Sequence, residues 1–220
     1  MGGKIAIIIG ATGLVGNHLL LRLLNDVQFD KVKIFVRTPT GMQHPKLEEY
    51  VIDFDKKKTY KKLVTGDVLF SCLGTTKRQA KTKAKQYKVD FTYQHNFAKM
   101  ASRNKVPSYV LVSSSSAKKN SKLFYLRMKG ELEEAVKQLN FSHIHIVQPS
   151  ILQGKRDKVR IGEKIAAKIA NISGRIIPRI KKYRSIKGEE VAAALYNIYN
   201  QQSDNGVFVY KLDELFNYQN

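Results

Sequence analysis

The apolar positions of the chain fall into short runs that alternate with segments of helical spacing. Runs typical of buried strands cover residues 4–9, 32–37, 50–54, 67–73, 109–112, 142–147 and 206–210. Apolar residues spaced three and four apart predict helices over 14–24, 83–104, 123–139, 162–172 and 188–199. Strands that alternate with helices are typical of a parallel sheet covered on both faces. We therefore predict an α/β fold built on a doubly wound parallel sheet.

This alternation is regular only as far as the segment Gln148-Pro149-Ser150. No internal repeat and no Ser/Gly/Pro-rich linker divides the chain. We expect a single domain, in which residues 1–150 form the core. Residues 151–220 are expected to form a small cap over the substrate and to return the last strand to the sheet.

Composition narrows the class of protein. The 220 residues, 43% of them hydrophobic and 10% aromatic, are enough for a packed core. The single cysteine, Cys72, excludes a disulfide framework and a cysteine-based zinc site. His143 and His145 share one face of a predicted strand without a third ligand, so we expect no metal. The first apolar run is too short for a signal peptide and no run could span a membrane, so we expect a cytoplasmic protein.

The charge is strongly positive, because 39 Lys and Arg face 18 Asp and Glu, a formal net charge of +21. Cationic surface attracts polyanions, but no nucleic-acid-binding motif accompanies it, and we do not expect nucleic acid as a partner. Two basic stretches, 77–88 and 155–160, follow predicted strands and would meet at the carboxyl edge of the sheet. They favour an anionic small-molecule substrate, although an evenly basic surface is an equal alternative.

The first strand runs into a glycine-rich turn that opens a helix. The turn reads Gly10-Ala11-Thr12-Gly13-Leu14-Val15-Gly16. Gly10 permits a sharp turn, Gly13 lets the backbone approach a pyrophosphate, and Gly16 lets helix and strand pack closely. The helix N-terminus then presents N–H groups to the phosphates. The strand-turn-helix context predicts a dinucleotide site.

The ends of the next strands complete the predicted cofactor site. Arg37 ends the second strand, where an acid would select NAD and a base accommodates the 2′-phosphate of NADP, so we predict NADP(H). The alternative for Arg37 is a plain surface cation. Asp53 and Phe54, at the end of the third predicted strand, are placed to flank the adenine. The fourth strand ends in Cys72-Leu73-Gly74-Thr75, where Leu73, Gly74 and Thr75 let the backbone lie against the cofactor.

A candidate catalytic group follows the fifth strand, at the edge where an open sheet binds ligands. Four consecutive serines, 113–116, are followed by Tyr125 and Lys129, which share one face of a predicted helix. A phenol has an ordinary pKa near 10, and a neighbouring ammonium lowers it toward the range useful for acid–base catalysis. The same pattern occurs at Tyr183 and Lys187, but only Tyr125 follows a strand-ending serine cluster.

Together the glycine turn, the serine cluster and Tyr125-x-x-x-Lys129 resemble the short-chain dehydrogenase/reductase superfamily, in its extended or atypical branch. The segments 70–76 (FSCLGTT) and 123–133 (LFYLRMKGELE) resemble the HIV Tat-interactive protein subfamily and its bacterial relatives. The resemblance implies a Rossmann-type fold, NADPH as cofactor, Tyr125 as proton donor and Lys129 on the nicotinamide ribose. It makes Ser114 or Ser115 the hydroxyl that holds the substrate carbonyl, and places Pro149 at the carboxamide end.

The sequence departs from the superfamily pattern at two places. Val89-Asp90 stands where many members have an Asn in the proton relay, and Gln148-Pro149-Ser150 replaces a common Arg-Pro-Gly. The predicted function is an NADPH-dependent oxidoreductase acting on a carbonyl or alcohol, with a non-catalytic, NADPH-binding regulator of a protein partner as the alternative. The long helices after the fourth and fifth strands could pair in a homodimer.

Overall fold

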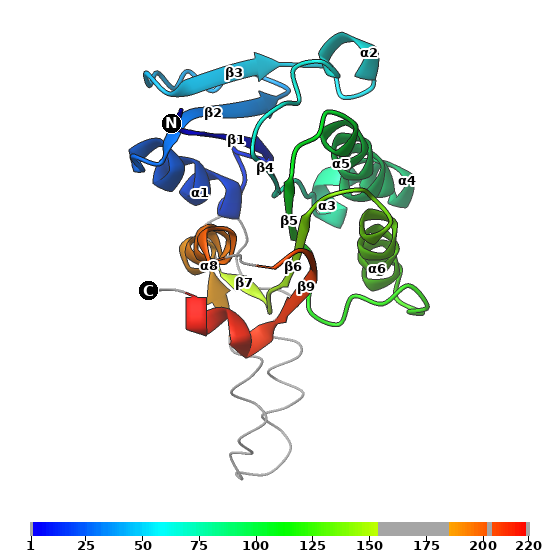
Figure 1. Ribbon diagram of the computed structural model, residues 1–220. Helices are drawn as coiled ribbons and strands as arrows, with labels where there is room; N and C mark the ends of the chain where they lie inside the picture. Colours follow the sequence, from blue (N-terminus) through cyan, green and yellow to red (C-terminus); the bar gives the residue numbers. More distant parts are fainter. Residues whose placement is uncertain (1, 154–184, 202–203, 219–220) are drawn as a thin grey trace.

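Seven strands form one parallel sheet in the computed structural model, which describes residues 2–153, 185–201 and 204–218 (Figure 1). They are β1 (Lys4–Ile9), β2 (Phe29–Val36), β3 (Leu47–Val51), β4 (Val68–Ser71), β5 (Ser108–Val112), β6 (His143–Gln148) and β9 (Gly206–Lys211). Their order is β3-β2-β1-β4-β5-β6-β9, and every neighbouring pair is parallel. The predicted doubly wound parallel sheet is confirmed.

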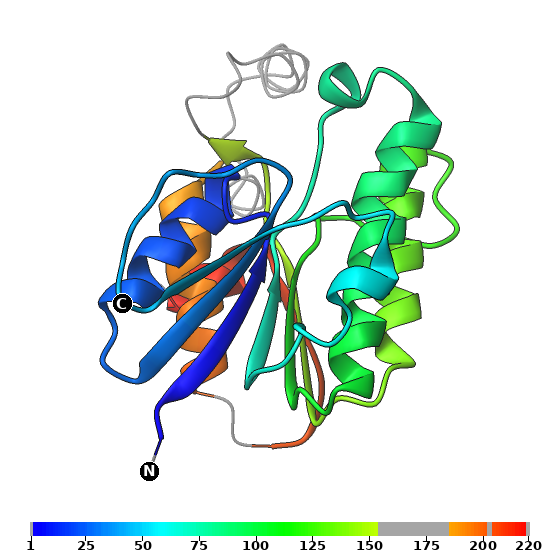
Figure 2. The same ribbon diagram turned by 90° about the horizontal axis from the view of Figure 1, so that it is seen from above.

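Helices cover both faces of this sheet (Figure 2). On one side lie α1 (Leu14–Asn25) and α8 (Gly188–Asn200), and on the other α5 (Gln94–Arg103) and α6 (Phe124–Lys137). Successive strand residues point to opposite faces, so each side has its own core. Ile8 belongs to the cluster that contains Leu19 and Leu195, whereas Ile7 belongs to the cluster that contains Phe97 and Leu132.

Two predicted elements near the groove differ from the structure. The third strand was expected at 50–54, but β3 pairs Leu47–Val51 with β2 and ends before Asp53 and Phe54. The Asp53 carbonyl instead accepts from the Lys56 N–H at 2.9 Å, and this turn carries Phe54 into the core. The helix expected over 83–104 is interrupted: α4 (Lys83–Tyr87) passes into η1 (Lys88–Tyr93), a π-helical turn, before α5 begins.

Several short elements have no counterpart in the predicted pattern. They are α2 (Lys57–Tyr60), α3 (Lys77–Ala80), the parallel pair β7 (Leu152–Gln153) and β8 (Ile186–Lys187), and the 3-10 turn η3 (Leu212–Tyr218). Each is too short to leave an apolar periodicity in the sequence. The helix expected over 162–172 and the basic stretch 155–160 lie outside the described residues. Of the Tyr183/Lys187 pattern, Tyr183 lies outside them and Lys187 belongs to β8.

The strand order fixes where loops converge. The chain moves outward from β1 to β3 on one side of the sheet and then restarts at β4 on the other side. Loops that leave the carboxyl ends of β1 and β4 therefore diverge in opposite directions and leave a crevice between them, where open α/β sheets bind their ligands. The glycine turn follows β1 and the segment 72–76 follows β4, so both border this crevice.

Candidate functional site

The turn after β1 is built in a way that requires glycine. Gly10 has φ +83°, and a Cβ there would lie 2.5 Å from the carbonyl carbon of Cys72. The Gly13 N–H donates to the Gly10 carbonyl at 2.9 Å, and a Cβ on Gly16 would overlap that same oxygen. The first turn of α1 contains no acidic residue, so its positive end remains available to an anion.

A pocket opens beside this turn, and we call it the Tyr125 pocket. The ends of β1, β4 and β5 and one face of α6 form its walls, and Leu152 of β7 borders it. From the predicted site it gathers Gly13, Leu14, Val15, Leu73, Gly74, Thr75, Tyr125 and Lys129, and to these it adds Cys72, Thr76, Gln79, Asp90, Val112 and Ser113. Residues remote in sequence are thus brought together in one pocket. Thr12 is exposed in the turn.

Tyr125 and Lys129 lie one turn apart on α6 and line the same pocket. The Tyr125 side chain is 40% exposed, whereas Lys129 is only 4% exposed. The Lys129 Nζ donates to the backbone carbonyl of Val112 at 3.4 Å. That contact anchors the ammonium at the end of β5, where its charge acts on the pocket rather than on bulk water.

The serine cluster is arranged differently from the expectation that Ser114 or Ser115 would face the substrate. Ser113 lines the Tyr125 pocket, and its Oγ donates to Glu133 Oε1 of α6. The Ser115 N–H donates to the Pro149 carbonyl at 2.9 Å, which ties the segment after β5 to the segment after β6. Within the described part of the chain, Ser114, Ser115 and Pro149 do not line the pocket. Because the four serines are adjacent, the sequence alone did not indicate which of them faces the pocket.

Asp90 is a pocket residue that sequence reasoning noted only as a departure from a family pattern. It is 1% exposed, and its Oδ1 and Oδ2 accept from the Thr75 N–H at 3.1 and 3.3 Å. Burial raises the pKa of the Asp90 carboxyl, and the nearby Lys129 charge opposes that rise. The π-helical turn η1 carries Asp90 into the pocket. Such turns occur frequently at functional sites, but they leave no clear sequence signature.

A second pocket, the Arg37 pocket, continues from the first. Arg37, Asp53, Phe54, Lys85 and Lys88 line it, and Thr75 and Gln79 line both pockets. The two pockets therefore form one groove, which passes along α3. The exposed Arg37 directly follows β2, as predicted. Asp53 Oδ1 accepts from the Asp55 N–H at 2.9 Å, and Phe54 packs among Tyr60, Tyr93 and Phe97.

Other candidate chemistry at the site is weak. Burial raises the pKa of the Cys72 thiol to about 12, so it is a poor nucleophile near neutrality. His143 and His145 stack on β6, and His145 Nδ1 lies 3.1 Å from the Tyr210 hydroxyl, as in ordinary strand packing.

Among the described residues no three His, Cys, Asp or Glu side chains are grouped to hold a metal ion. In the same part of the chain no helix has the length and apolarity needed to cross a membrane.

Comparison with known proteins identifies the family. Residues 10–201 match the model of a family described as NAD(P)H-binding. The chain belongs to this NAD(P)H-binding family. The match begins at the first glycine of the turn and spans the residues that line both pockets.

Relatives within the NAD(P)H-binding family agree with the resemblance found in the sequence. Protein FMP52 of Candida glabrata is 37% identical over 199 residues, which cover 88% of this chain and 84% of the relative. Protein HTATIP2 of Rattus norvegicus is 34% identical over 172 residues, covering 76% and 71%. The expected membership of an atypical short-chain dehydrogenase/reductase group related to the HIV Tat-interactive protein is confirmed.

Solved structures support the fold. The Bordetella bronchiseptica enzyme WbmH, in complex with NAD+, superposes with a TM-score of 0.72 at 14% identity and covers 96% of this chain and 76% of its own. A UDP-N-acetylglucosamine 4-epimerase from Methanobrevibacter ruminantium, in complex with UDP-N-acetylmuramic acid, gives a TM-score of 0.69 at 17% identity, covering 99% and 81%. At such low identity the likeness extends to the Rossmann-type fold alone.

The relatives also correct one expectation. A cytoplasmic protein was expected from the absence of a recognisable targeting or membrane segment. That expectation is wrong, because the related proteins of Candida glabrata and of Aspergillus niger, the latter 33% identical over 198 residues, are named as mitochondrial. A mitochondrial targeting signal depends on amphipathic, basic character rather than on a long apolar run, and hydropathy alone does not detect a signal of that kind.

Proposed function

We propose that this protein is an NADPH-dependent oxidoreductase of the short-chain dehydrogenase/reductase type. It transfers a hydride to or from a carbonyl or alcohol substrate, with Tyr125 as the acid or base. The observation that carries the proposal is that Tyr125 and Lys129 open into one pocket with the Gly13 and Gly74 backbone. A phenol, an ammonium and close-approach backbone thus meet at the crevice of a nicotinamide-binding fold.

The groove fits the cofactor along its length. Gly10 and Gly16 permit the tight turn and the close packing of α1, and Gly13, which lines the pocket, lets a pyrophosphate approach the start of α1. The Arg37 pocket takes the adenosine half, where Asp53 and Phe54 border the adenine and Arg37, assisted by Lys85, receives the 2′-phosphate. Leu73, Gly74 and Thr75 lie along the nicotinamide half. Pro149 is assigned to the carboxamide end by the family resemblance.

Bound NADPH supplies the hydride, and the chain supplies the proton and the binding groups. The Tyr125 hydroxyl donates its proton to the substrate oxygen as the carbonyl becomes an alcohol, and accepts one in the reverse direction. The Lys129 ammonium binds the nicotinamide ribose. Ser113 lines the Tyr125 pocket together with these groups. Ser114 and Ser115 remain the candidates that the resemblance implies for holding the carbonyl.

Substitution of the two α6 residues tests the reaction. Tyr125→Phe is expected to abolish carbonyl reduction while leaving NADPH affinity nearly unchanged, because the phenol acts on the substrate. Lys129→Ala is expected to reduce both. Tyr87→Phe is the matched control, since the Tyr87 hydroxyl donates to Glu131 at 3.1 Å on α6 and does not line the Tyr125 pocket. Full turnover by Tyr125→Phe with any substrate would remove Tyr125 from the mechanism.

The second candidate function is a regulator that binds NADPH without turnover and acts through a protein partner. The names of the FMP52 and HTATIP2 relatives state no reaction, which favours it. A screen of aldehydes and ketones with NADPH separates the two. Oxidation of NADPH that Tyr125→Phe abolishes supports the enzyme, whereas tight binding with no reduction across the screen supports the regulator.

Three further features complete the proposal. The chain is one domain, with residues 1–150 as the cofactor core and residues 151–220 as the cap; the position of Leu152 on the Tyr125 pocket supports this division.

The substrate is anionic, as the six exposed cations of residues 77–88 suggest. Finally, α5 and α6 pack side by side and offer a surface for a homodimer, which sedimentation or light scattering would detect.

A further inference from the structure

The carboxyl group of Glu133 joins three elements behind the Tyr125 pocket. Glu133 lies on α6 one turn after Lys129 and is 5% exposed. Its Oε1 accepts from Ser113 Oγ at the end of β5. Both of its oxygens accept from Gln148 Nε2 at the end of β6, at 2.9 and 3.0 Å. The proposed reaction leaves this fully hydrogen-bonded buried acid without a role.

Glu133 and its hydrogen-bond partners separate the Tyr125 pocket from a second hollow. On one side its partner Ser113 lines the Tyr125 pocket together with Lys129. On the other side Glu133 and Gln148 line a hollow of about 620 Å³ between α6, β9 and the loop 115–120. Glu133 holds the Ser113 hydroxyl, and Lys129 is anchored on the carbonyl of Val112, the residue before Ser113. Movement of the backbone at 112–113 would therefore displace both Ser113 and the Lys129 ammonium.

The electrostatics of Glu133 link it to Lys129. Burial raises the pKa of the Glu133 carboxyl, while the hydrogen bonds from Ser113 and Gln148 and the charges of Lys137 and Lys129 oppose that rise. Gln148 is neutral, so the charges that act on the carboxylate come from the two lysines of its own helix. Glu133 and Lys129 lie four residues apart on α6, where opposite charges attract, and burial leaves that attraction weakly screened.

We propose that Glu133 is a positioning residue of the Tyr125 pocket: its carboxylate fixes Ser113 in the pocket wall and holds the Lys129 ammonium one helical turn away. The inference rests on the proposed function, because Lys129 is assigned there to the nicotinamide ribose. It adds that this assignment depends on a carboxylate outside the pocket. Glu133 touches neither substrate nor cofactor and acts only through Ser113 and Lys129.

A double-mutant cycle on NADPH affinity tests the inference without any substrate. Glu133→Gln keeps the shape and one acceptor but loses the charge, and is expected to weaken NADPH binding. In a Lys129→Ala background the same substitution is expected to lose most of that effect, with a coupling of about fivefold or more. The control is Glu134→Gln, the neighbouring acid that pairs with Lys137 at 2.6 Å on the surface, which should change affinity less than about twofold.

The double-mutant cycle tests the role of Glu133, and turnover separately tests the proposed reaction. Independent effects of Glu133→Gln and Lys129→Ala, or equal effects of Glu133→Gln and Glu134→Gln, would overturn the inference. Melting temperatures identify a variant that fails to fold, in which case Glu133→Asp, which keeps the charge, is expected to restore affinity relative to Glu133→Ala. If the wild type binds NADPH but reduces no carbonyl compound, the proposed reaction fails while the cycle still decides the role of Glu133.

Where a substrate is found, the pH profile supplies a second readout. Titratable groups lie on both sides of Glu133. Those that line the Tyr125 pocket are Cys72, Asp90, Tyr125 and Lys129, and those that line the hollow with Glu133 are Lys118, Lys119, Glu134, Lys137 and Lys211. If the ionised carboxylate positions the site, kcat falls as the pH drops through the raised pKa of Glu133. Glu133→Gln should remove that acid limb and Glu134→Gln should keep it. Persistence of the same limb in Glu133→Gln would assign it to another group, such as Asp90, and contradict the inference.

Discussion

The carboxylate of Asp90 accepts the backbone N–H of Thr75 at 3.1 Å and so fastens the π-helical turn η1 to the loop that borders both pockets. Two further hydrogen bonds connect the same turn to β4. Gln94 Nε2 donates to the Asp90 carbonyl at 2.7 Å, and Ser71 Oγ, at the end of β4, donates to Gln94 Oε1 at 2.8 Å. The end of β4, the loop after it and the long helical segment are therefore one hydrogen-bonded unit beside the cofactor groove.

Asp90→Asn is expected to stabilise the protein progressively as the pH rises. Burial raises the pKa of Asp90 in the folded state, so the stability that its protonated form contributes is complete below the unfolded pKa and is lost as pH rises through the folded pKa. Asparagine keeps an acceptor for Thr75 and does not ionise. Denaturant unfolding at pH 4 and pH 8 should therefore show a larger advantage of the variant at pH 8.

The control for this pH dependence has the opposite sign. Asp55 is exposed and pairs with Lys88 at 2.7 Å, and this hydrogen bond lowers the pKa of the Asp55 carboxyl. Its contribution is present above the unfolded pKa and is lost as pH falls. Asp55→Asn should therefore cost stability at pH 8 and little at pH 3. An Asp90→Asn advantage that is independent of pH would contradict burial as the cause.

Arg37→Ala is expected to remove a preference for NADPH over NADH. The contact between a guanidinium and a phosphate contributes about 1–3 kcal/mol, and NADH lacks the phosphate. Affinity for NADPH should fall by that amount while affinity for NADH changes little, and Arg37→Asp should act more strongly. Arg103→Ala, at the exposed C-terminal end of α5, is the control. Equal affinity of the wild type for both cofactors would refute the assignment to NADP(H).

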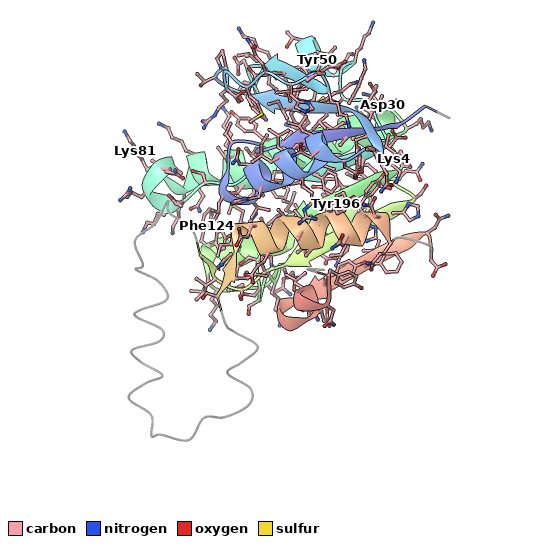
Figure 3. The ribbon with its side chains drawn as sticks, turned by 90° about the vertical axis from the view of Figure 1, so that its left-hand side faces the viewer. Lys4, Asp30, Tyr50, Lys81, Phe124 and Tyr196 are labelled. Carbon is pink, nitrogen blue, oxygen red and sulfur yellow. The ribbon has the colours of Figure 1, made fainter. Side chains whose placement is uncertain are left out.

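Charge reversal at the rim of the groove tests whether the substrate is anionic. Lys81 and Phe124 lie at the same end of the molecule, opposite Lys4 and Asp30 (Figure 3). The Lys83 ammonium lies 5.7 Å from the ring of Phe124, the residue that precedes Tyr125 on α6. Lys81→Glu and Lys83→Glu together should lower the association rate of an anionic substrate more than reversal of Lys57 and Lys58 on α2.

Ionic strength and a matched substrate pair sharpen this test. Steered association should slow as salt rises to physiological strength, where the screening length is about 8 Å. An aromatic aldehyde bearing a carboxylate should be reduced with a higher kcat/KM than its neutral methyl ester, and the rim reversals should abolish the difference. Similar losses from the rim and from the α2 reversals would show that the positive charge is not directed to the site.

Gly16→Ala is expected to disrupt the turn that holds the cofactor. The added Cβ would overlap the Gly10 carbonyl oxygen, so α1 must shift away from β1. Overpacking of this kind costs about 1–3 kcal/mol of stability, and the displaced helix terminus should bind NADPH more weakly. Gly2→Ala is the control, since a Cβ there meets nothing within 4 Å. Unchanged melting temperature and NADPH affinity in Gly16→Ala would contradict the role given to close packing.

Those parts of the fold that depend on local periodicity could be predicted from the sequence. The prediction located β1 and α1 because an apolar strand, a glycine turn and an amphipathic helix follow one another in the chain. Tyr125 and Lys129 were also predictable, since residues four apart must share a helix face. The sequence alone does not show which strand residues pair, so the prediction set the third strand three residues late and ended it at Asp53 and Phe54.

The less predictable part of the site depends on contacts between distant segments. The hydrogen bond from Ser113 to Glu133 distinguishes one serine among four, and no local pattern encodes that contact. Similarly, Gln148 was noted as a departure from a family pattern, but its two bonds to Glu133 require β6 and α6 to be packed together. Such roles follow from tertiary structure and could be proposed only once the strand order was known.

The π-helical turn makes Asp90 unusually dependent on the length of the chain around it. A π-helical turn accommodates an additional residue within an α-helix, and each residue of a regular helix advances by about 100°. Deletion of Val89 would let residues 83–103 close into a continuous α-helix and rotate Asp90 away from Thr75. A single-codon deletion could thus remove a buried acid from the cofactor groove while preserving the helix that carries it. Among relatives, the presence or absence of this one residue would be a more informative marker of pocket chemistry than the identity of its neighbours.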